Sequence, residues 1–467
     1  MNLSNVGTEK PALPQKTRRQ IFVSTLLGNV VEYYDFTLYG TLAAIIAMHF
    51  FDQSNAFVAL ISVYVGVVLS YAIRPLGGLI LGPVGDLKGR KFVLILSIAL
   101  MTIGTAGIGL LPTYAAIGVA APIILLLSRA LQGIGASVEY TTAANFLLEH
   151  ERGRRRNLIS GVLNSTASVG SLTAALVAYL LSAFMPGDSF QDWGWRIPFL
   201  LAIPVAVVGV YMRRKLDESS LFKEAKEQIN RKEEKHAPLR LTLKDHWKDI
   251  VRVISLSLGQ RIGSYIIQAY FVTALIASGF PPEQALLASV LVYALGPITS
   301  VWGGWLADRF GGRLPLIVGY ALFIVLTVPA FYLIGQPSIF NATLAVIVFT
   351  LINNLVAAPL STAYSLAFPP AVRATASALT FNLGTSIFGA TAGLVAVWLH
   401  EITGTDVAFG WYVTVACVIS LVVSIFALPE CLKYRYAKAL REDSEKVQAS
   451  NIQRQKIDAS SKRAPRF

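Results

Sequence analysis

Long apolar runs recur along almost the whole chain and limit what it can fold into. Crossing the hydrocarbon core of a bilayer as a helix takes roughly 20 apolar residues. Runs of about that length or longer cover residues 21–51, 56–82, 92–111, 117–148, 157–184, 194–212, 250–277, 284–306, 314–334, 340–368, 373–398 and 408–428. Charged residues make up only 14% of the chain, against about 25% in a soluble domain. We therefore expect an all-α integral membrane protein with about twelve transmembrane helices.

Lys and Arg gather on alternate segments between these runs. Basic clusters lie at 10–19, 88–91, 152–156, 213–252, 309–313 and 433–464. The intervening segments contain few or no basic residues. This alternation follows the positive-inside rule, so both termini are expected to be cytoplasmic. Membrane topology therefore explains the net charge of +13 and argues against a nucleic-acid partner.

A hydrophilic stretch divides the apolar runs into two sets of about six, which is typical of a protein built from two repeated bundles. The expected organisation is a cytoplasmic tail at 1–20, a first bundle at 21–212, a cytoplasmic linker at 213–249, a second bundle at 250–428 and a basic cytoplasmic tail at 429–467. The two cysteines, Cys417 and Cys431, predict neither a disulfide framework nor a metal site.

The two sets share a short motif after their second helix. It reads GPVGDLKGRK at 82–91 and GWLADRFGGR at 304–313. The first glycine lets helices approach closely, the aspartate at a helix end can pair with basic groups or a helix N-terminus, and the next glycine makes a tight turn. We interpret both copies as a conformational latch that holds one state and breaks in another; a plain basic loop is the alternative. The latch residues are Gly82, Asp86, Gly89, Arg90, Lys91, Asp308, Arg309 and Arg313.

The doubled motif resembles the signature of the major facilitator superfamily. Three further stretches, GNVVEYYDFTLYG at 28–40, IRPLGG at 73–78 and SRALQGIGASVEY at 128–140, resemble one branch of it, the metabolite:H+ symporters. That resemblance implies a transporter of two pseudo-symmetric six-helix bundles in a bacterial inner membrane. It also implies import of a small organic acid or zwitterion together with protons, without a cofactor and as a monomer.

The resemblance assigns roles to charged residues within the apolar runs. The positions that match the family's charged residues are Glu32, Asp35, Arg74, Arg129 and Glu139. Among these, we assign Glu32, Asp35 and Glu139 to proton coupling and Arg74 to structural charge. The chain departs from the family pattern at Tyr33–Tyr34, Leu87, Ser137–Val138 and Thr141–Thr142. The departures at 137–142 lie beside the expected cavity, so they leave the substrate open.

The first apolar run carries a polar stripe. Residues at i, i+3 and i+6 share a helix face, so Asn29, Glu32 and Asp35 line up, with Tyr39 just beyond. Two carboxylates this close in a low dielectric cannot easily both ionise, and the pair should titrate as a unit. We expect at least one of them to carry the coupled proton, with Asp35 favoured. The alternative is a structural pair neutralised by an arginine.

Arg261 lies in the middle of the seventh run, and the second set of runs offers no acidic partner for it. An arginine does not lose its proton, so inside a membrane it needs an anion or water. We predict that Arg261 binds an anionic group of the substrate, for which a bidentate guanidinium is suited. The alternative is an ion pair with Asp35 or Glu32 across the central cavity.

Other polar residues in the runs are candidates for the substrate site. We assign Arg129, Asn29, Tyr39, Gln260 and Gln268 to it together with Arg261. Amide side chains also join helices to one another, so helix packing is the alternative role.

Other classes of function lack their motifs. The sequence has no Walker-type loop and no hydrolase motif at a plausible site, so we expect neither an ATP motor nor an enzyme. Proton-driven export of a drug or metabolite is the main rival to import. The fifth run lacks the proline of the exporter signature, which favours import.

Overall fold

A computed structural model describes residues 15–88, 90–137, 155–214, 246–368 and 373–427. Within these ranges the chain forms α-helices and short π-helical turns, and no strand. The first half contains α1 (Gln15–Thr41), α2 (Ala43–Phe50), α3 (Ala56–Ala72), α4 (Arg74–Lys88), α5 (Arg90–Leu110), α6 (Tyr114–Ile117), α7 (Ala120–Ala136), α9 (Arg156–Phe184), η1 (Phe190–Gly194), α10 (Arg196–Leu200) and α11 (Ala202–Arg214). The second half contains α14 (Trp247–Tyr265), η2 (Ile266–Tyr270), α15 (Phe271–Ala277), α16 (Pro282–Phe310), α17 (Arg313–Ile334), α18 (Ile339–Leu366), α19 (Arg373–Gly384), η3 (Thr385–Gly389), α20 (Ala392–Thr403) and α21 (Val407–Phe426).

These helices join into longer segments that follow the apolar runs, and the predicted all-α membrane fold is confirmed. In the described part of the chain, nine helical spans are long and apolar enough to cross a membrane. Helices α1, α7 and α14 complete the set of twelve segments predicted from the runs. The proposed linker at 213–249 falls mainly on residues outside the described ranges, so the domain boundaries stay a prediction.

Several segments are broken where the sequence predicted continuous helices. The second is divided at Ile73, between α3 and α4. Pro75 follows two residues later, and a proline removes a backbone hydrogen bond and favours a helix start. The seventh widens into the π-helical turn η2. Such turns commonly occur at functional sites, and this one borders the cavity described below.

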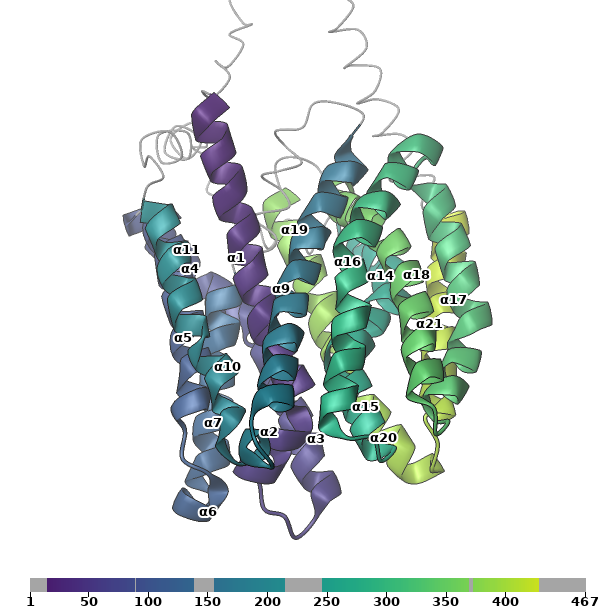
Figure 1. Ribbon diagram of the computed structural model, residues 1–467. Helices are drawn as coiled ribbons and strands as arrows, with labels where there is room; N and C mark the ends of the chain where they lie inside the picture. The colour runs from purple at the N-terminus through teal and green to yellow at the C-terminus, as the bar shows by residue number, and fades with distance from the viewer. Residues whose placement is uncertain (1–14, 89, 138–154, 215–245, 369–372, 428–467) are drawn as a thin grey trace, which may run out of the picture.

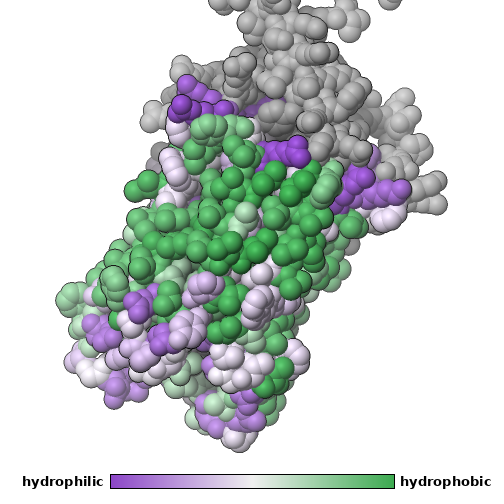
Figure 2. Space-filling view, turned by 90° about the vertical axis from the view of Figure 1, so that its right-hand side faces the viewer, coloured by the Kyte–Doolittle hydropathy of each residue, from purple (hydrophilic) through white to green (hydrophobic). Residues whose placement is uncertain are grey.

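The outer surface carries an apolar band, as expected for helices long enough to cross a membrane. Figure 2 shows a broad apolar band on one face, bounded by hydrophilic residues at both ends. Large apolar side chains such as Ile298, Val325 and Val415 are exposed. Exposed apolar surface of this extent is stable in contact with lipid rather than water.

The two halves lie side by side and meet along α9 and α16 (Figure 1). Glycines let these two helices approach closely. A Cβ atom at Gly161 would collide with the backbone of Ser300, and one at Gly304 with the backbone of Asn157 and Leu158. The close approach predicted for Gly304 therefore occurs, and it joins one half to the other.

A second contact between the halves lies toward the end that carries the 51–55 and 278–281 loops. The Tyr64 hydroxyl of α3 is 2.8 Å from the carbonyl oxygen of Ala269 and 3.0 Å from Thr273 Oγ1. Gly40 also packs against Ala269. These contacts close this end of the seam.

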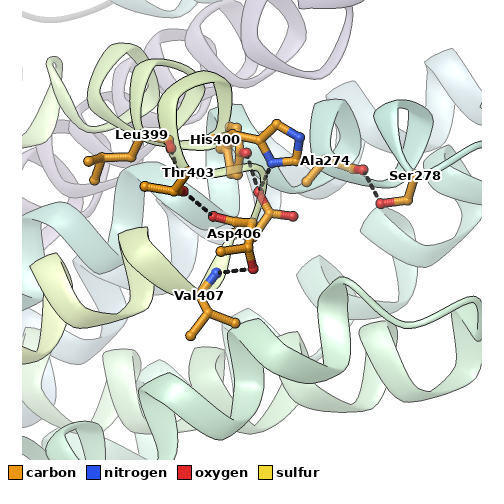
Figure 3. A network of polar contacts seen from close by, with 9 residues as sticks. Ala274, Ser278, Leu399, His400, Thr403, Asp406 and Val407 are labelled. Carbon is orange, nitrogen blue, oxygen red and sulfur yellow. Dashed lines mark hydrogen bonds and ion pairs between the residues drawn. The ribbon is translucent and has the colours of Figure 1, made fainter.

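A buried carboxylate fixes the neighbouring loop of the second half. Asp406 precedes α21 and is 6% exposed. Its Oδ1 accepts a hydrogen bond of 2.7 Å from Tyr270 and lies 2.9 Å from His400 Nδ1, and Figure 3 shows His400 beside it. Asp406 thus joins α20 and α21 to η2.

Candidate functional site

A cavity lies between the two halves. Its walls come from α1 and α9 of the first half and from α14, η2, α16 and α18 of the second. It consists of two adjoining, partly open pockets that share part of their lining. The lining is largely polar and includes Tyr33, Asn164, Ser168, Ser171, Gln260, Arg261, Ser264, Tyr265, Gln268, Tyr293, Thr350, Asn353, Asn354, Ser361 and Tyr364. The polarity of the lining suits a small hydrophilic molecule.

Arg261 brings a positive charge to this cavity. It is 8% exposed, and its Nε donates a 3.2 Å hydrogen bond to the Tyr364 hydroxyl. Its guanidinium carbon lies 3.9 Å from the centre of the Phe381 ring. The aromatic rings hold the guanidinium in one orientation, which suits it to an oriented, bidentate contact with an anion.

Amide and hydroxyl groups form the rest of the polar wall. Gln260 Nε2 donates to Ser264 Oγ at 2.7 Å, and Asn353 Nδ2 donates to the same oxygen at 3.0 Å. Asn164 and Ser361 pair across the seam at 3.3 Å. Gln260 and Gln268, two of the predicted substrate residues, lie in this wall.

The first half holds a separate group of buried charges behind the cavity wall. Glu32 Oε1 and Arg74 Nη2 are 2.9 Å apart, and the two side chains are 3% and 2% exposed. The Arg74 guanidinium also stacks 4.0 Å from the centre of the Tyr71 ring. A buried ion pair of this kind is costly to break because one charge would remain uncompensated.

Asp35 is the second buried carboxylate of α1. It is 2% exposed, and among the described residues neither of its oxygens has a hydrogen-bond partner. Its charged neighbours are Arg129 and Glu32, and Thr105 lies within reach. The Thr105 hydroxyl donates instead to the carbonyl oxygen of Met101 at 2.9 Å. A buried carboxylate without donors is costly to keep ionised, so this group is suited to carrying a proton.

Arg129 lies beside Asp35 and is fully buried. Its Nη1 donates to Gln132 Oε1 at 2.7 Å, and Gln132 Nε2 donates to Thr105 Oγ1 at 2.6 Å. The Tyr39 ring packs 4.0 Å from the guanidinium carbon. Gln132 therefore connects the arginine to the threonine that borders Asp35.

Asn29, Tyr39 and Arg129, also assigned to the substrate site from the sequence, lie away from the described cavity lining. Asn29 donates to the carbonyl oxygen of Leu163 and to Thr166 Oγ1, at 3.1 and 3.0 Å. Tyr39 donates to the carbonyl oxygen of Val63 at 3.1 Å. These bonds join α1 to α9 and α3. Glu139 lies outside the described residues.

The second copy of the latch motif makes a contact between the halves. Asp308, near the end of α16, accepts hydrogen bonds from the backbone N–H groups of Asn157 and Leu158 at 3.0 and 2.9 Å. Asn157 Nδ2 donates to it at 2.9 Å. These donors belong to the first turn of α9, where a negative charge is favourable. Asp308 therefore acts on a helix of the other half as an N-cap residue would.

The remaining latch residues are placed as follows. Arg313 Nη2 donates to the carbonyl oxygen of Ile425 at 2.7 Å, near the end of α21. Arg309 packs against the rings of Trp305 and Phe310. In the first copy, Gly89 and the side chains of Asp86, Arg90 and Lys91 lie outside what the structure describes, and Gly82 belongs to α4.

Residues 25–393 match the family described as Major Facilitator Superfamily. The chain belongs to the major facilitator superfamily. It is 31% identical to the proline/betaine transporter of Salmonella typhimurium strain LT2, over 87% of this chain and 83% of that protein. It is also 31% identical, with the same coverage, to the glycine betaine/proline/ectoine/pipecolic acid transporter OusA of Dickeya dadantii strain 3937. The superfamily branch indicated by the motifs is thereby confirmed.

Solved structures of the superfamily share the fold at lower identity. The proton:xylose symporter XylE bound to 6-bromo-6-deoxy-D-glucose superposes with a TM-score of 0.71 at 15% identity, over 89% of this chain and 96% of that one. This facilitator is therefore a multi-pass membrane transporter and not an enzyme.

Sequence reasoning missed several residues of the site. The sequence marks Tyr33 only as a departure from the family pattern and offers no reason to select Tyr265 or Tyr364, yet all three line the cavity. Gln132 was not singled out, although it follows Arg129 by three residues and so shares its helix face. Its position one helical turn from a buried charge is the sequence signal that could have identified Gln132.

Proposed function

We propose that this facilitator imports a small organic acid or zwitterion together with protons, by alternating access, in a bacterial inner membrane. Both termini are placed in the cytoplasm, and a single chain is taken as the working unit. The observation that carries the proposal is Asp35. It is a buried carboxylate without hydrogen-bond partners among the described residues, on the helix that also presents Tyr33 to the cavity.

In this proposal the two polar regions have different tasks. Asp35 takes up a proton while the site is open to the outside, and Arg261 binds the anionic group of the solute. When Asp35 releases its proton, its carboxylate attracts Arg129, which is otherwise bonded to Gln132. That rearrangement moves α1 and therefore one wall of the cavity. Only a differential interaction of this kind shifts the balance between conformations.

Latch residues then set the balance between the two states. Asp308 holds α16 against α9 by three hydrogen bonds, and these must break when the two halves separate at that end. The first copy, through Asp86, is proposed to act in the same way at its own end of the repeat. Breaking such contacts and forming others is how rigid bundles alternate.

The test is solute-driven proton movement in proteoliposomes that contain a pH-sensitive dye. Addition of a transported solute outside should acidify the lumen, and an imposed inward proton gradient should drive solute accumulation. A protonophore should abolish accumulation. Uphill uptake that persists with the protonophore present would refute proton symport, and solute leaving in exchange for entering protons would support the exporter instead.

A further inference from the structure

Three aromatic side chains form a continuous line from the buried charges of the first half to the cavity. Phe36 follows Asp35 on α1, and the centre of its ring lies 4.9 Å from the centre of the Tyr71 ring of α3. The Tyr71 ring lies 5.3 Å from the ring of Tyr265, the last residue of α14. Tyr265 lines the cavity. The line therefore crosses from one half to the other and ends at the cavity.

Both buried arginines of the first half contact the start of this line. The guanidinium carbons of Arg74 and Arg129 lie 4.8 and 5.1 Å from the centre of the Phe36 ring. These arginines are the neighbours of the two carboxylates of α1, because Arg74 pairs with Glu32 and Arg129 lies beside Asp35. A cation over an aromatic ring is attracted to it. A shift of either guanidinium therefore changes the forces that hold Phe36.

The contact between the halves is closely packed. The rings of Tyr71 and Tyr265 meet at 75°, an edge-to-face arrangement that aromatic pairs favour, and the two side chains are 5% and 8% exposed. Gly389 of η3 lies against Tyr265, and a Cβ atom there would come within 2.8 Å of its ring. The ring therefore has no room to move toward η3. Because close-packed interiors transmit displacements, a shift of Tyr71 reaches the cavity wall.

Several charged and titratable groups surround the line. They come from α1, α4 and α7 and are Tyr33, Glu32, Asp35, Tyr39, Arg74 and Arg129. An arginine keeps its proton in proteins, and a tyrosine loses its proton only in strongly alkaline solution. Glu32 is held by its ion pair with Arg74. Asp35 is therefore the group around the line that is suited to changing its charge.

We infer that Tyr265 is a positioning residue that links the charge of Asp35 to the solute cavity through the rings of Phe36 and Tyr71. This inference rests on the proposed function and names the side chains that join its two polar regions. When Asp35 loses its proton, Arg129 moves and Phe36 moves with it, and Tyr71 passes the displacement to Tyr265. Because a coupling free energy is reciprocal, a solute that displaces Tyr265 acts back on Asp35.

Two fluorine reporters test the link without a solute. Para-fluorophenylalanine, which does not titrate, replaces Phe36 in one sample and Tyr265 in another. Fluorine NMR on the full chain in lipid nanodiscs then follows each signal as the pH is changed. Both signals should shift with the same midpoint, and Asp35→Asn should abolish both shifts. A signal at position 265 that does not respond to pH would overturn the inference.

Variants of Tyr71 decide whether its ring carries the response. Tyr71→Leu should keep the shift at position 36 and abolish the shift at position 265, whereas Tyr71→Phe, which keeps the ring, should preserve both. Phe323→Leu is the matched control, because it removes a buried ring that packs on Phe349, outside the line. If the shift at position 265 survives in Tyr71→Leu, or if both shifts are lost there, the link through Tyr71 is refuted.

The dye assay in proteoliposomes separates this inference from the proposed function, with proline and glycine betaine as the probes. Tyr71→Leu should lower the number of protons moved per solute and leave the KM for solute nearly unchanged. If position 265 responds through Tyr71 but neither probe moves protons, proton symport of these solutes is wrong and the link stands. If the probes move protons but position 265 does not respond, symport stands and the link is wrong.

Discussion

The buried polar groups of the first half differ in kind from those of the second. Around α1 they include two pairs of charges, Glu32 with Arg74 and Asp35 near Arg129, all at most 3% exposed. Along α14 and α18 they are amides and hydroxyls around a single arginine, and they face open space. Charges enclosed by protein can store or release a proton without contacting solute. Neutral groups beside a cavity can recognise solute without changing charge. We propose that coupling depends on the charges around α1, and that recognition depends mainly on the groups along α14 and α18.

The largest expected effect follows from removing the proton group. Asp35→Asn keeps the shape of the side chain and cannot ionise, so gradient-driven accumulation should be lost. Exchange of solute across the membrane at equal concentrations should survive. Counterflow and uphill uptake in proteoliposomes measure both. Asp52→Asn, in an exposed loop, is the control, and normal uphill uptake in Asp35→Asn would remove the coupling role.

Breaking the buried ion pair should affect folding more than recognition. Glu32→Ala or Arg74→Ala alone leaves an uncompensated charge and should lower stability by about 3–5 kcal/mol. The double variant should be less damaged than the sum of the two, because the charges leave together. Thermal unfolding in detergent measures this. Additive losses would show that the two side chains do not depend on one another.

Removing the cation of the cavity tests recognition in the second half. Arg261→Ala should weaken solute binding by about ten- to a hundredfold, as expected for loss of a charge-assisted contact. Lysine at this position should restore only part of it, since it lacks the planar fork. In the double variant with Asp35→Asn, the losses of solute binding should add if the two residues have separate roles. If they form an ion pair, the double variant should recover part of the binding.

Gln132 tests whether the first half affects coupling without touching solute. Gln132→Leu removes the link between Arg129 and Thr105 and should lower turnover about fivefold or more, with a changed pH profile of uptake. The KM for solute should stay nearly constant. A larger change in KM than in turnover would place Gln132 on the recognition side, and Gln132→Glu, which keeps an acceptor for Arg129, should be milder.

The latch should have the smallest effect. Asp308→Asn weakens a charge–dipole contact worth about 0.3–2 kcal/mol, so it should change the ratio of the two conformations a few-fold and leave solute affinity nearly unchanged. Cysteine accessibility from each side of the membrane measures the ratio. Asp86→Asn is expected to act in the same direction. Asp188→Asn, in a loop, is the control, and unchanged accessibility in both latch variants would refute the role.

The helices and the chemical character of the site could be predicted from the sequence. Apolar runs locate helices because a bilayer demands a certain length of apolar chain, and a buried arginine such as Arg261 stands out within them. The structure places Gln260 and Gln268 beside it in the cavity wall. Their contact with substrate stays a prediction.

The partners of these residues could not be read from the sequence. Asp308 contacts Asn157, about 150 positions away, and Thr105 meets Gln132 through the packing of α5 on α7. Such pairs depend on which helices are neighbours and on how each is rotated. The break at Ile73 was foreshadowed by Pro75, whereas η2 has no equally local signal.

The loop carboxylate Asp406 affects how the seam can open at the end where Tyr64 contacts Ala269. Tyr270, which it binds, directly follows Ala269, the residue that receives the Tyr64 hydroxyl. The hairpin of α20 and α21 therefore stiffens the very turn against which the first half rests. Because these contacts make η2 rigid, separation of the two halves at this end should break the hydrogen bonds of Tyr64 and leave η2 unchanged. The part of α14–α15 next to Tyr64 would then move with its own bundle as a rigid unit.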